Sequence, residues 1–273
     1  MIHSLSLPEG RIHAETDGTG PTIVFVHADF VDGRLWDGLR AILAPRYRTV
    51  VYDKLGYGRS DPVTGPVVRR RELAAVVGAL CPEPFHLVGC SNGGQQALDY
   101  TLENPARVRS LTLVNASPSG WVPQGAPPPV LLAMIAALQK GDLAAASELQ
   151  IQLFFDGPER SESGLSPQVR RARSQAAEMN RIFVDRGTYF LSDANPAEPL
   201  DPPALGRLGE IRVSTLVVDG RRDWPENRQA NRYLAEGIPG CRLIEVDAGH
   251  VPAMEDPEGF AAFWESAMRP GVQ

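Results

Sequence analysis

A serine flanked by small residues carries the strongest chemical signal in this sequence. The run Gly89-Cys90-Ser91-Asn92-Gly93 has the spacing G-x-S-x-G and separates a hydrophobic segment at 85–89 from a helical pattern at 93–103. A strand that turns sharply into a helix strains its corner residue, and glycines beside that residue avoid steric clashes. The Ser91 hydroxyl would then lie exposed at a sheet edge beside a helix N-terminus, which favours nucleophilic chemistry.

A serine hydroxyl needs a base before it can attack a carbonyl carbon. Of the five histidines, His250 is the best placed, because it follows the last predicted strand in the loop Asp247-Ala-Gly-His-Val-Pro252. Loops at the carboxyl ends of parallel strands share one edge of a sheet. We therefore expect His250 to reach Ser91.

The base in turn needs an acid that fixes its tautomer. Asp223, in Val218-Asp-Gly-Arg-Arg-Asp-Trp224, follows the penultimate predicted strand. We favour it over Asp219, which lies closer to that strand and lacks the loop length to swing outward. The order Ser91, Asp223, His250 is the chain order that accompanies a nucleophile elbow. These residues predict a Ser–His–Asp triad.

Strands and helices must alternate to position these side chains. Strands are predicted at 22–28, 49–53, 85–89, 108–114, 213–218 and 242–246, and helices at 35–43, 73–80, 93–103, 226–236 and 257–268. The predicted strands of the first half of the chain are continuous hydrophobic runs rather than alternating ones, which is typical of strands covered on both faces. We therefore expect an α/β fold with a largely parallel sheet flanked by helices.

The alternation stops between residues 120 and 207. This stretch shows only helical patterns, near 130–140, 142–155 and 167–183. We expect one α/β core, residues 1–119 and 208–273, interrupted by a helical insertion at 120–207. An insertion after the carboxyl end of a strand lies over the ligand crevice, so we interpret this one as a cap. The alternative is a structural decoration away from the site.

Composition narrows the class of protein. The 273 residues carry a formal net charge of −6 and are 43% hydrophobic, as in an ordinary globular protein. No basic cluster indicates nucleic-acid binding, the longest apolar run is too short to cross a membrane, and we see no signal peptide. Cys81, Cys90 and Cys241 do not form a disulfide or zinc pattern. We expect a cytoplasmic monomer or homodimer without a metal.

Taken together, the motifs resemble the α/β-hydrolase superfamily over nearly the whole chain, most of all its small, cap-bearing esterase, lactonase and C–C hydrolase branch. Besides the serine motif, the matching segments are Val26-His-Ala-Asp-Phe30, Tyr52-Asp-Lys-Leu-Gly-Tyr-Gly-Arg-Ser60 and Ala248-Gly-His-Val-Pro252. The resemblance implies an α/β-hydrolase fold and a cofactor-free serine hydrolase of small carboxylic esters or lactones.

The resemblance also implies two oxyanion donors, the backbone N–H groups of Asn92 and Asp29. The family usually has His-Gly in the second loop, whereas this chain has His27-Ala28-Asp29. An acidic side chain directed at a forming oxyanion would repel it. We therefore expect the Asp29 carboxylate to face away or to bind a polar group of the substrate. His27 is expected to brace the loop.

Further side chains are candidates for other roles. Phe30, Trp121, Trp224 and Val251 are candidates for the substrate pocket, with core packing as an equal alternative for the tryptophans. Cys90 is expected to pack inward. The arginines of the insertion are expected to form a solvated helix face rather than to select acidic substrates; they are Arg160, Arg170, Arg171, Arg173, Arg181 and Arg186.

Three alternative functions remain open. The first is a C–C bond hydrolase of diketones with the same triad. The second is a cofactor-free lyase or oxygenase in which His250 acts mainly as a base. The third is a small-molecule receptor that retains the triad residues. Family members that open epoxides or displace halides have an aspartate nucleophile, and Ser91 excludes that chemistry.

Overall fold

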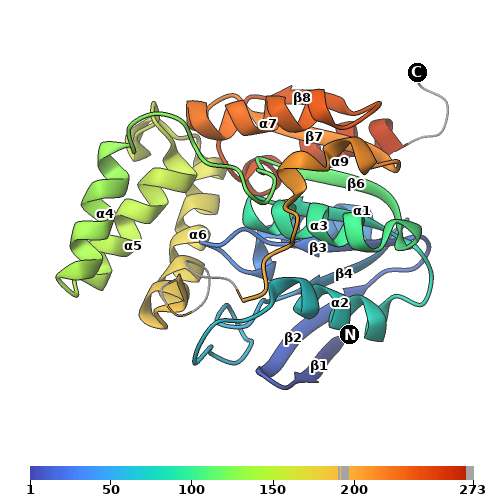
Figure 1. The fold of residues 1–273 in the computed structure, drawn as a ribbon. Coiled ribbons are helices and arrows are strands. Elements are labelled where there is room, and N and C mark those ends of the chain that lie inside the picture. Colours follow the sequence, from blue (N-terminus) through green and yellow to red (C-terminus); the bar gives the residue numbers. More distant parts are fainter. Residues whose placement is uncertain (190, 192–196, 269–273) are drawn as a thin grey trace.

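A central eight-stranded sheet, in the order β1-β2-β4-β3-β5-β6-β7-β8, organises the molecule (Figure 1). The computed structural model describes residues 1–189, 191 and 197–268. The strands are β1 (Ile2–Leu7), β2 (Gly10–Asp17), β3 (Thr22–Val26), β4 (Arg48–Tyr52), β5 (Phe85–Cys90), β6 (Val108–Val114), β7 (Ser214–Gly220) and β8 (Arg242–Val246).

The direction of the strands brings several loops to one edge of the sheet. The β1–β2 and β2–β4 pairs are antiparallel. All pairs from β4 to β8 are parallel. The predicted α/β class with a largely parallel sheet is therefore confirmed. The strand order reverses at β3, which lies between β4 and β5, and such a switch point opens a crevice at the carboxyl ends of the strands.

Helices cover both faces of the sheet. One core cluster joins strand residues such as Val24 and Val26 to α2 (Arg69–Leu80), α3 (Asn92–Glu103) and α7 (Pro225–Gly237). The other joins Ile23 and Phe25 to α1 (Asp37–Leu43), the short α8 (Pro252–Glu255) and α9 (Pro257–Met268). Alternate residues of β3 thus enter opposite clusters, and both sets are apolar. This explains why the parallel strands appear in the sequence as continuous hydrophobic runs.

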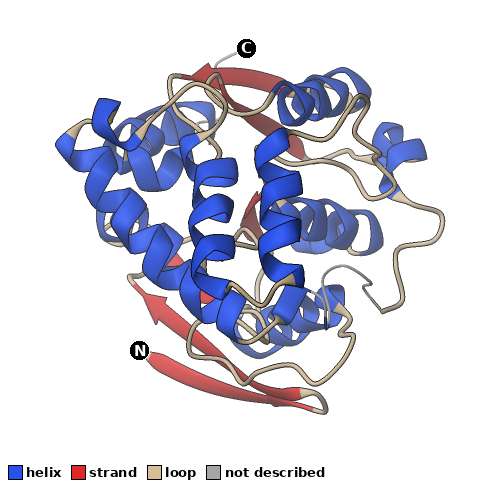
Figure 2. Ribbon diagram, turned by 90° about the vertical axis from the view of Figure 1, so that its left-hand side faces the viewer, coloured by secondary structure: helices blue, strands red, loops and turns tan. Residues whose placement is uncertain are grey.

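The insertion forms a separate group of helices beyond one end of the sheet (Figures 1 and 2). It contains α4 (Pro129–Gln139), α5 (Leu143–Ile151), a π-helical turn (Gln152–Asp156) and α6 (Pro167–Asp185). None of its described residues lies in a strand, as the sequence predicts. Phe155, Ala176 and Met179 of this group join the core cluster that contains α1 and α9. The insertion therefore packs on the core through apolar side chains.

The cysteines, the lengths of the helices and the possible metal-binding groups bear on the expectations drawn from composition. The three cysteines are free thiols. In the part of the chain that the structure describes, no helix is both long and apolar enough to cross a bilayer, and no group of three His, Cys, Asp or Glu side chains is arranged to hold a metal ion.

Candidate active site

Ser91 occupies the corner between β5 and α3 in a backbone conformation that few residues adopt. Its φ is 55° and its ψ is −124°, a strained region for a residue with a side chain. A Cβ atom on Gly89 would lie 2.3 Å from the Gly93 carbonyl oxygen, and one on Gly93 would lie 2.5 Å from the carbonyl oxygens of Val26 and His27. The corner therefore requires both glycines of the motif.

Asp223 and His250 are brought together by the loops that follow β7 and β8. His250 Nδ1 lies 2.6 Å from Asp223 Oδ2, and both side chains are almost fully buried. Asp223 Oδ1 accepts hydrogen bonds from the Trp224 N–H at 2.8 Å and from Asn227 Nδ2 at 3.0 Å. These bonds orient the carboxylate. Because a carboxylate only accepts, the proton of the imidazole is placed on Nδ1.

The rival acid, Asp219, belongs to another network. This fully buried residue lies within β7 and accepts hydrogen bonds from Arg228 Nε at 3.0 Å and from Asn231 Nδ2 at 2.8 Å, both on α7. Its contacts join a strand to the helix that covers it. Of the two aspartates that follow the penultimate predicted strand, the structure brings Asp223 to the imidazole.

The second ring nitrogen of His250 is buried without a hydrogen-bond partner among the described residues. Buried polar atoms almost always have partners, and an exception calls for an explanation such as a catalytic role. With the proton on Nδ1, the Nε2 atom presents a lone pair that can take a proton. Ser91 Oγ is not hydrogen-bonded to it here. In unliganded enzymes such contacts are often long and tighten when substrate binds.

The loop that carries His250 is tied to the strands beside Ser91. Asn115 directly follows β6 and donates from Nδ2 to the carbonyl oxygens of Gly249 and His250 at 3.0 and 2.9 Å. Cys90 Sγ lies 3.5 Å from the same His250 oxygen, and burial raises the pKa of this thiol. Cys90 therefore points inward as a protonated thiol, which is a poor nucleophile. Sequence reasoning missed Asn115, whose only signal is its place after a strand.

The predicted oxyanion donors lie at the carboxyl ends of β5 and β3. Asn92 is the first residue of α3, so its N–H has no acceptor within the helix. Asp29 follows β3, and Lys54 Nζ donates to its carboxylate at 2.5 Å. Ala28 does not have a positive φ. The loop therefore does not need the glycine that the family usually has at this position.

His27 braces the loop that carries Asp29. Its Nδ1–H donates to the Ala28 carbonyl oxygen at 2.7 Å, and its Nε2 accepts the Lys54 N–H at 3.0 Å. Full burial and the neighbouring Lys54 charge hold the pKa of His27 well below its usual range. The ring is therefore neutral, and both nitrogens are engaged in holding the loop.

Two phenylalanines lie against the imidazole of His250. The Phe30 and Phe154 rings stack with centroids 5.4 Å apart, and they lie 6.1 and 5.5 Å from the His250 ring. Phe30 was a predicted pocket residue, whereas Phe154 was missed. Phe154 belongs to the π-helical turn of the insertion, where nothing in the sequence separates it from ordinary core residues.

The other predicted pocket residues have different surroundings. Trp224 Nε1–H donates to the Leu153 carbonyl oxygen at 2.5 Å and so joins the Asp223 loop to the insertion. Val251 is fully buried in the core. The Trp121 ring packs on the Tyr233 ring of α7 at 5.1 Å. Of the four candidates, Phe30 is the one in ring contact with His250.

The arginines of the insertion do not form one solvated face, and the expectation was wrong for Arg160 and Arg173. Arg173 is buried and donates to Asp156 at 2.9 Å. Arg160 pairs with Glu255, a buried residue of α8, which also accepts the Gly249 N–H at 2.8 Å. Three arginines of the insertion are exposed, namely Arg170, Arg171 and Arg181. The acidic partner of Arg160 comes from a distant segment, which helical spacing cannot reveal.

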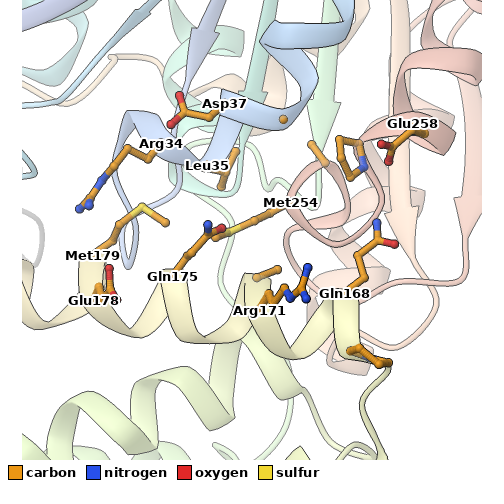
Figure 3. A pocket seen from close by; sticks show the side chains of 15 residues that line it. Arg34, Leu35, Asp37, Gln168, Arg171, Gln175, Glu178, Met179, Met254 and Glu258 are labelled. Atoms are coloured by element: carbon orange, nitrogen blue, oxygen red, sulfur yellow. The ribbon is translucent and has the colours of Figure 1, made fainter.

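The cavities of the structure do not by themselves identify the site of the predicted triad. One of about 640 Å³ lies between α6 and the core helices α1, α8 and α9 (Figure 3). Its lining mixes Met179 and Met254 with charged groups such as Arg34 and Glu178, and it includes no member of the predicted triad. A smaller cavity of about 70 Å³ borders Asn92.

Comparison with known proteins places the chain in a family. The model of the alpha/beta hydrolase family matches residues 23–263. Pimeloyl-[acyl-carrier protein] methyl ester esterase from Aeromonas hydrophila is 28% identical over 253 residues, covering 91% of this chain and 96% of the relative. A 2-hydroxy-6-oxononadienedioate/2-hydroxy-6-oxononatrienedioate hydrolase from Klebsiella pneumoniae is 29% identical over 271 residues, covering 94% and 91%.

Solved structures agree on the fold. The enol-lactonase from Burkholderia xenovorans LB400 superposes with a TM-score of 0.76 at 19% identity, covering 97% of this chain and 99% of the other. This likeness and the family match confirm the predicted α/β-hydrolase fold. Since the family model spans most of the sequence, the chain belongs to the alpha/beta hydrolase family.

Proposed function

We propose that this enzyme is a serine hydrolase of small carboxylic esters, lactones included, with Ser91, His250 and Asp223 as its triad. The observation that carries the proposal is the 2.6 Å hydrogen bond between Asp223 and His250, which leaves Nε2 of a buried imidazole as a proton acceptor. Ser91 supplies the hydroxyl from a strained corner at the same edge of the sheet.

In this mechanism Ser91 Oγ attacks the substrate carbonyl while His250 Nε2 takes the hydroxyl proton. Asp223 stabilises the imidazolium that forms. The N–H groups of Asn92 and Asp29 donate to the oxyanion, and such a donor contributes about 3 kcal/mol to the barrier reduction. His250 then gives its proton to the leaving alcohol. Water attacks the acyl-enzyme with His250 again as the base, which frees the acid and restores Ser91.

We further propose that residues 120–207 form a cap over this site and that residues 1–119 and 208–273 form the core domain. The support comes from contacts near the imidazole. Phe154 of the insertion lies against the His250 ring, and Trp224 donates to Leu153. An apolar cover of this kind excludes water and strengthens the electrostatic interactions beneath it. It favours substrates with an apolar group near the ester.

A C–C bond hydrolase of diketones is the second candidate. The hydrolase from Klebsiella pneumoniae, whose name describes an oxo-dienedioate substrate, is as similar to this chain as the methyl ester esterase is. A dianionic substrate needs basic partners in the pocket. Arg160 and Arg173 of the insertion are already paired with Glu255 and Asp156, so the contacts favour the ester.

A fluorophosphonate probe and a panel of nitrophenyl esters and lactones test the proposal. We expect covalent labelling of Ser91 and turnover of at least one ester, and Ser91→Ala should lose both while circular dichroism shows an intact fold. Ser174→Ala, at an exposed serine of α6, is the matched control and should keep both. Full ester turnover by Ser91→Ala would reject the mechanism.

The same panel separates the alternatives. Labelling of Ser91 without turnover of any ester would point to a receptor. Turnover of a diketone alone would establish the C–C hydrolase, and oxygen uptake with an aromatic substrate would establish an oxygenase.

A further inference from the structure

Lys54 is a lysine in an unusual position. The chain has 27 basic residues but only two lysines, Lys54 and Lys140. The Lys54 side chain is 0% exposed, and its Nζ lies 2.5 Å from Asp29 Oδ1 and 4.7 Å from the centre of the Tyr57 ring. Lysine is almost never fully buried unless its charge is paired. The ammonium is therefore held inside the protein by a specific acid.

Lys54 holds the loop after β3 through two hydrogen bonds. The Lys54 backbone N–H donates to His27 Nε2 at 3.0 Å, and the ammonium donates to Asp29 two residues further along the loop. The other nitrogen of His27 donates to the Ala28 carbonyl oxygen at 2.7 Å. Main chain and side chain of Lys54 thus hold both ends of the segment His27-Ala28-Asp29.

The charge of Asp29 makes this contact relevant to chemistry. In the proposed function the Asp29 N–H donates to the oxyanion, so the carboxylate of the same residue lies within a few ångströms of the developing negative charge. Two negative charges so close repel each other, and the repulsion is screened less inside a protein than in water. A cation on the Asp29 carboxylate offsets this repulsion.

We propose that Lys54 is a positioning residue for the oxyanion hole: its buried ammonium neutralises the Asp29 carboxylate, while its backbone N–H, through His27, holds the loop that presents the Asp29 N–H. The inference rests on the proposed function, in which that N–H meets the oxyanion. It explains how this chain accommodates an acidic residue at an oxyanion donor. Lys54 acts through Asp29 and does not touch the substrate.

Two variants test the electrostatic part of this role. Lys54→Met keeps the length of the side chain and removes its charge. It should lower kcat by about 10- to 100-fold, less than the loss of about 10²- to 10³-fold that follows complete removal of one oxyanion donor, with little change in KM. Binding of a boronic acid that mimics the tetrahedral intermediate should weaken in parallel. Lys140→Met, at the end of α4, removes the other lysine and should leave kcat unchanged.

The double variant Asp29→Asn/Lys54→Met separates charge from simple anchoring. It removes both charges, so kcat should return to within a few-fold of the unmodified enzyme even if Lys54→Met alone is unstable. Full activity in Lys54→Met, or a double variant as slow as Lys54→Met, would overturn the inference. The unmodified enzyme must first turn over an ester and be labelled at Ser91. Failure there would instead overturn the proposed function, and this inference with it.

Discussion

His250 Nδ1 and Asp223 Oδ2 lie 2.6 Å apart, although 27 residues separate them in the chain. They meet because β7 and β8 are parallel neighbours whose following loops leave the same edge of the sheet. Asp223 lies just beyond β7, where its N–H donates to the Gly220 carbonyl oxygen at 3.0 Å in a tight turn. This turn carries Asp223 out of the strand, whereas Asp219 remains inside it.

Asp223→Asn should lower kcat by about 10³- to 10⁴-fold with an intact fold. The amide of asparagine can present an N–H group to Nδ1, which favours the tautomer with the proton on Nε2. That tautomer cannot take the proton of Ser91. Steady-state kinetics with the best ester of the panel, together with circular dichroism, measure the effect.

The matched control for this variant is Asp219→Asn. It changes the other buried aspartate, which is bound to Arg228 and Asn231. Its kcat should stay within a few-fold of the unmodified enzyme, although its thermal stability should fall. If both variants lost activity equally, Asp223 would have no special role in orienting His250.

The glycines of the serine motif should be needed for folding as well as for catalysis. In Gly93→Ala the new methyl group would lie 2.5 Å from two backbone oxygens of β3 and the loop after it. Backbone cannot move aside easily, so we expect a loss of about 2 to 3 kcal/mol in the free energy of unfolding. Urea denaturation measures this loss.

Gly78→Ala provides the matched comparison for that measurement. Gly78 lies in α2 with no atom within 4 Å of its would-be Cβ. Alanine is favoured over glycine in a helix by about 0.5 to 1 kcal/mol, so this variant should be slightly more stable. A Gly93→Ala variant as stable as Gly78→Ala would show that the corner at Ser91 tolerates a side chain.

Elements with local signals could be predicted from the sequence. The predicted strands at 108–114 and 242–246 coincide with β6 and β8, and the predicted helix at 257–268 coincides with α9. The run around Ser91 signals both a strand end and a helix start. Gly89 is required by a clash with Gly93 a few residues on, whereas the clash that requires Gly93 comes from Val26 and His27 in another element. The edge of the sheet at which the loops of Asp223 and His250 lie could be predicted from the direction of the strands. The roles of these two residues are our proposal.

Contacts between distant segments could not be predicted in the same way. Arg160 looks like a solvated arginine because its partner, Glu255, is 95 residues away. Lys54 looks like a surface residue after a strand, and only the fold shows that Asp29 meets it inside the protein. Phe154 carries no signal in the sequence, and only the fold shows that its ring lies against His250. In each of these three cases, the residue that determines the surroundings of the side chain lies in another element of the fold.

The stability of the protein should depend on the titration of Asp99, a residue of α3. Burial raises its pKa to about 6 from an ordinary value of 3.8. The folded state therefore binds more protons than the unfolded chain between about pH 4 and 6, so stability falls as pH rises through this window, by up to about 3 kcal/mol. Asp99→Asn abolishes this titration.

The free energy of unfolding of Asp99→Asn, relative to the unmodified enzyme, should therefore increase from about pH 4 to about pH 7. The Ser119 hydroxyl donates to Asp99 at 2.7 Å, and an asparagine oxygen can still accept that bond. Urea denaturation at several pH values gives the comparison. Two parallel stability curves across this range would contradict the prediction.

Arg160 links the insertion to the loop of His250, and its loss should destabilise that loop in a pH-dependent way. Its guanidinium donates to the Asp156 carbonyl oxygen at 3.0 Å and to Glu255, while Glu255 accepts the Gly249 N–H at 2.8 Å. Breaking such a buried pair costs about 3 kcal/mol or more. Arg160→Met should therefore lower the free energy of unfolding, and kcat should fall as His250 loses its support.

The sign of the pH effect follows from Glu255. Burial already raises its pKa, and removing Arg160 raises it further, so the folded variant holds a proton that the unfolded chain releases. The destabilisation by Arg160→Met should therefore be larger at pH 8 than at pH 5. Arg171→Met, at an exposed arginine of α6, controls for the loss of a positive charge and should show no such difference. An equal loss at both pH values would mean that Glu255 draws no support from Arg160, because only an ionised Glu255 needs the guanidinium.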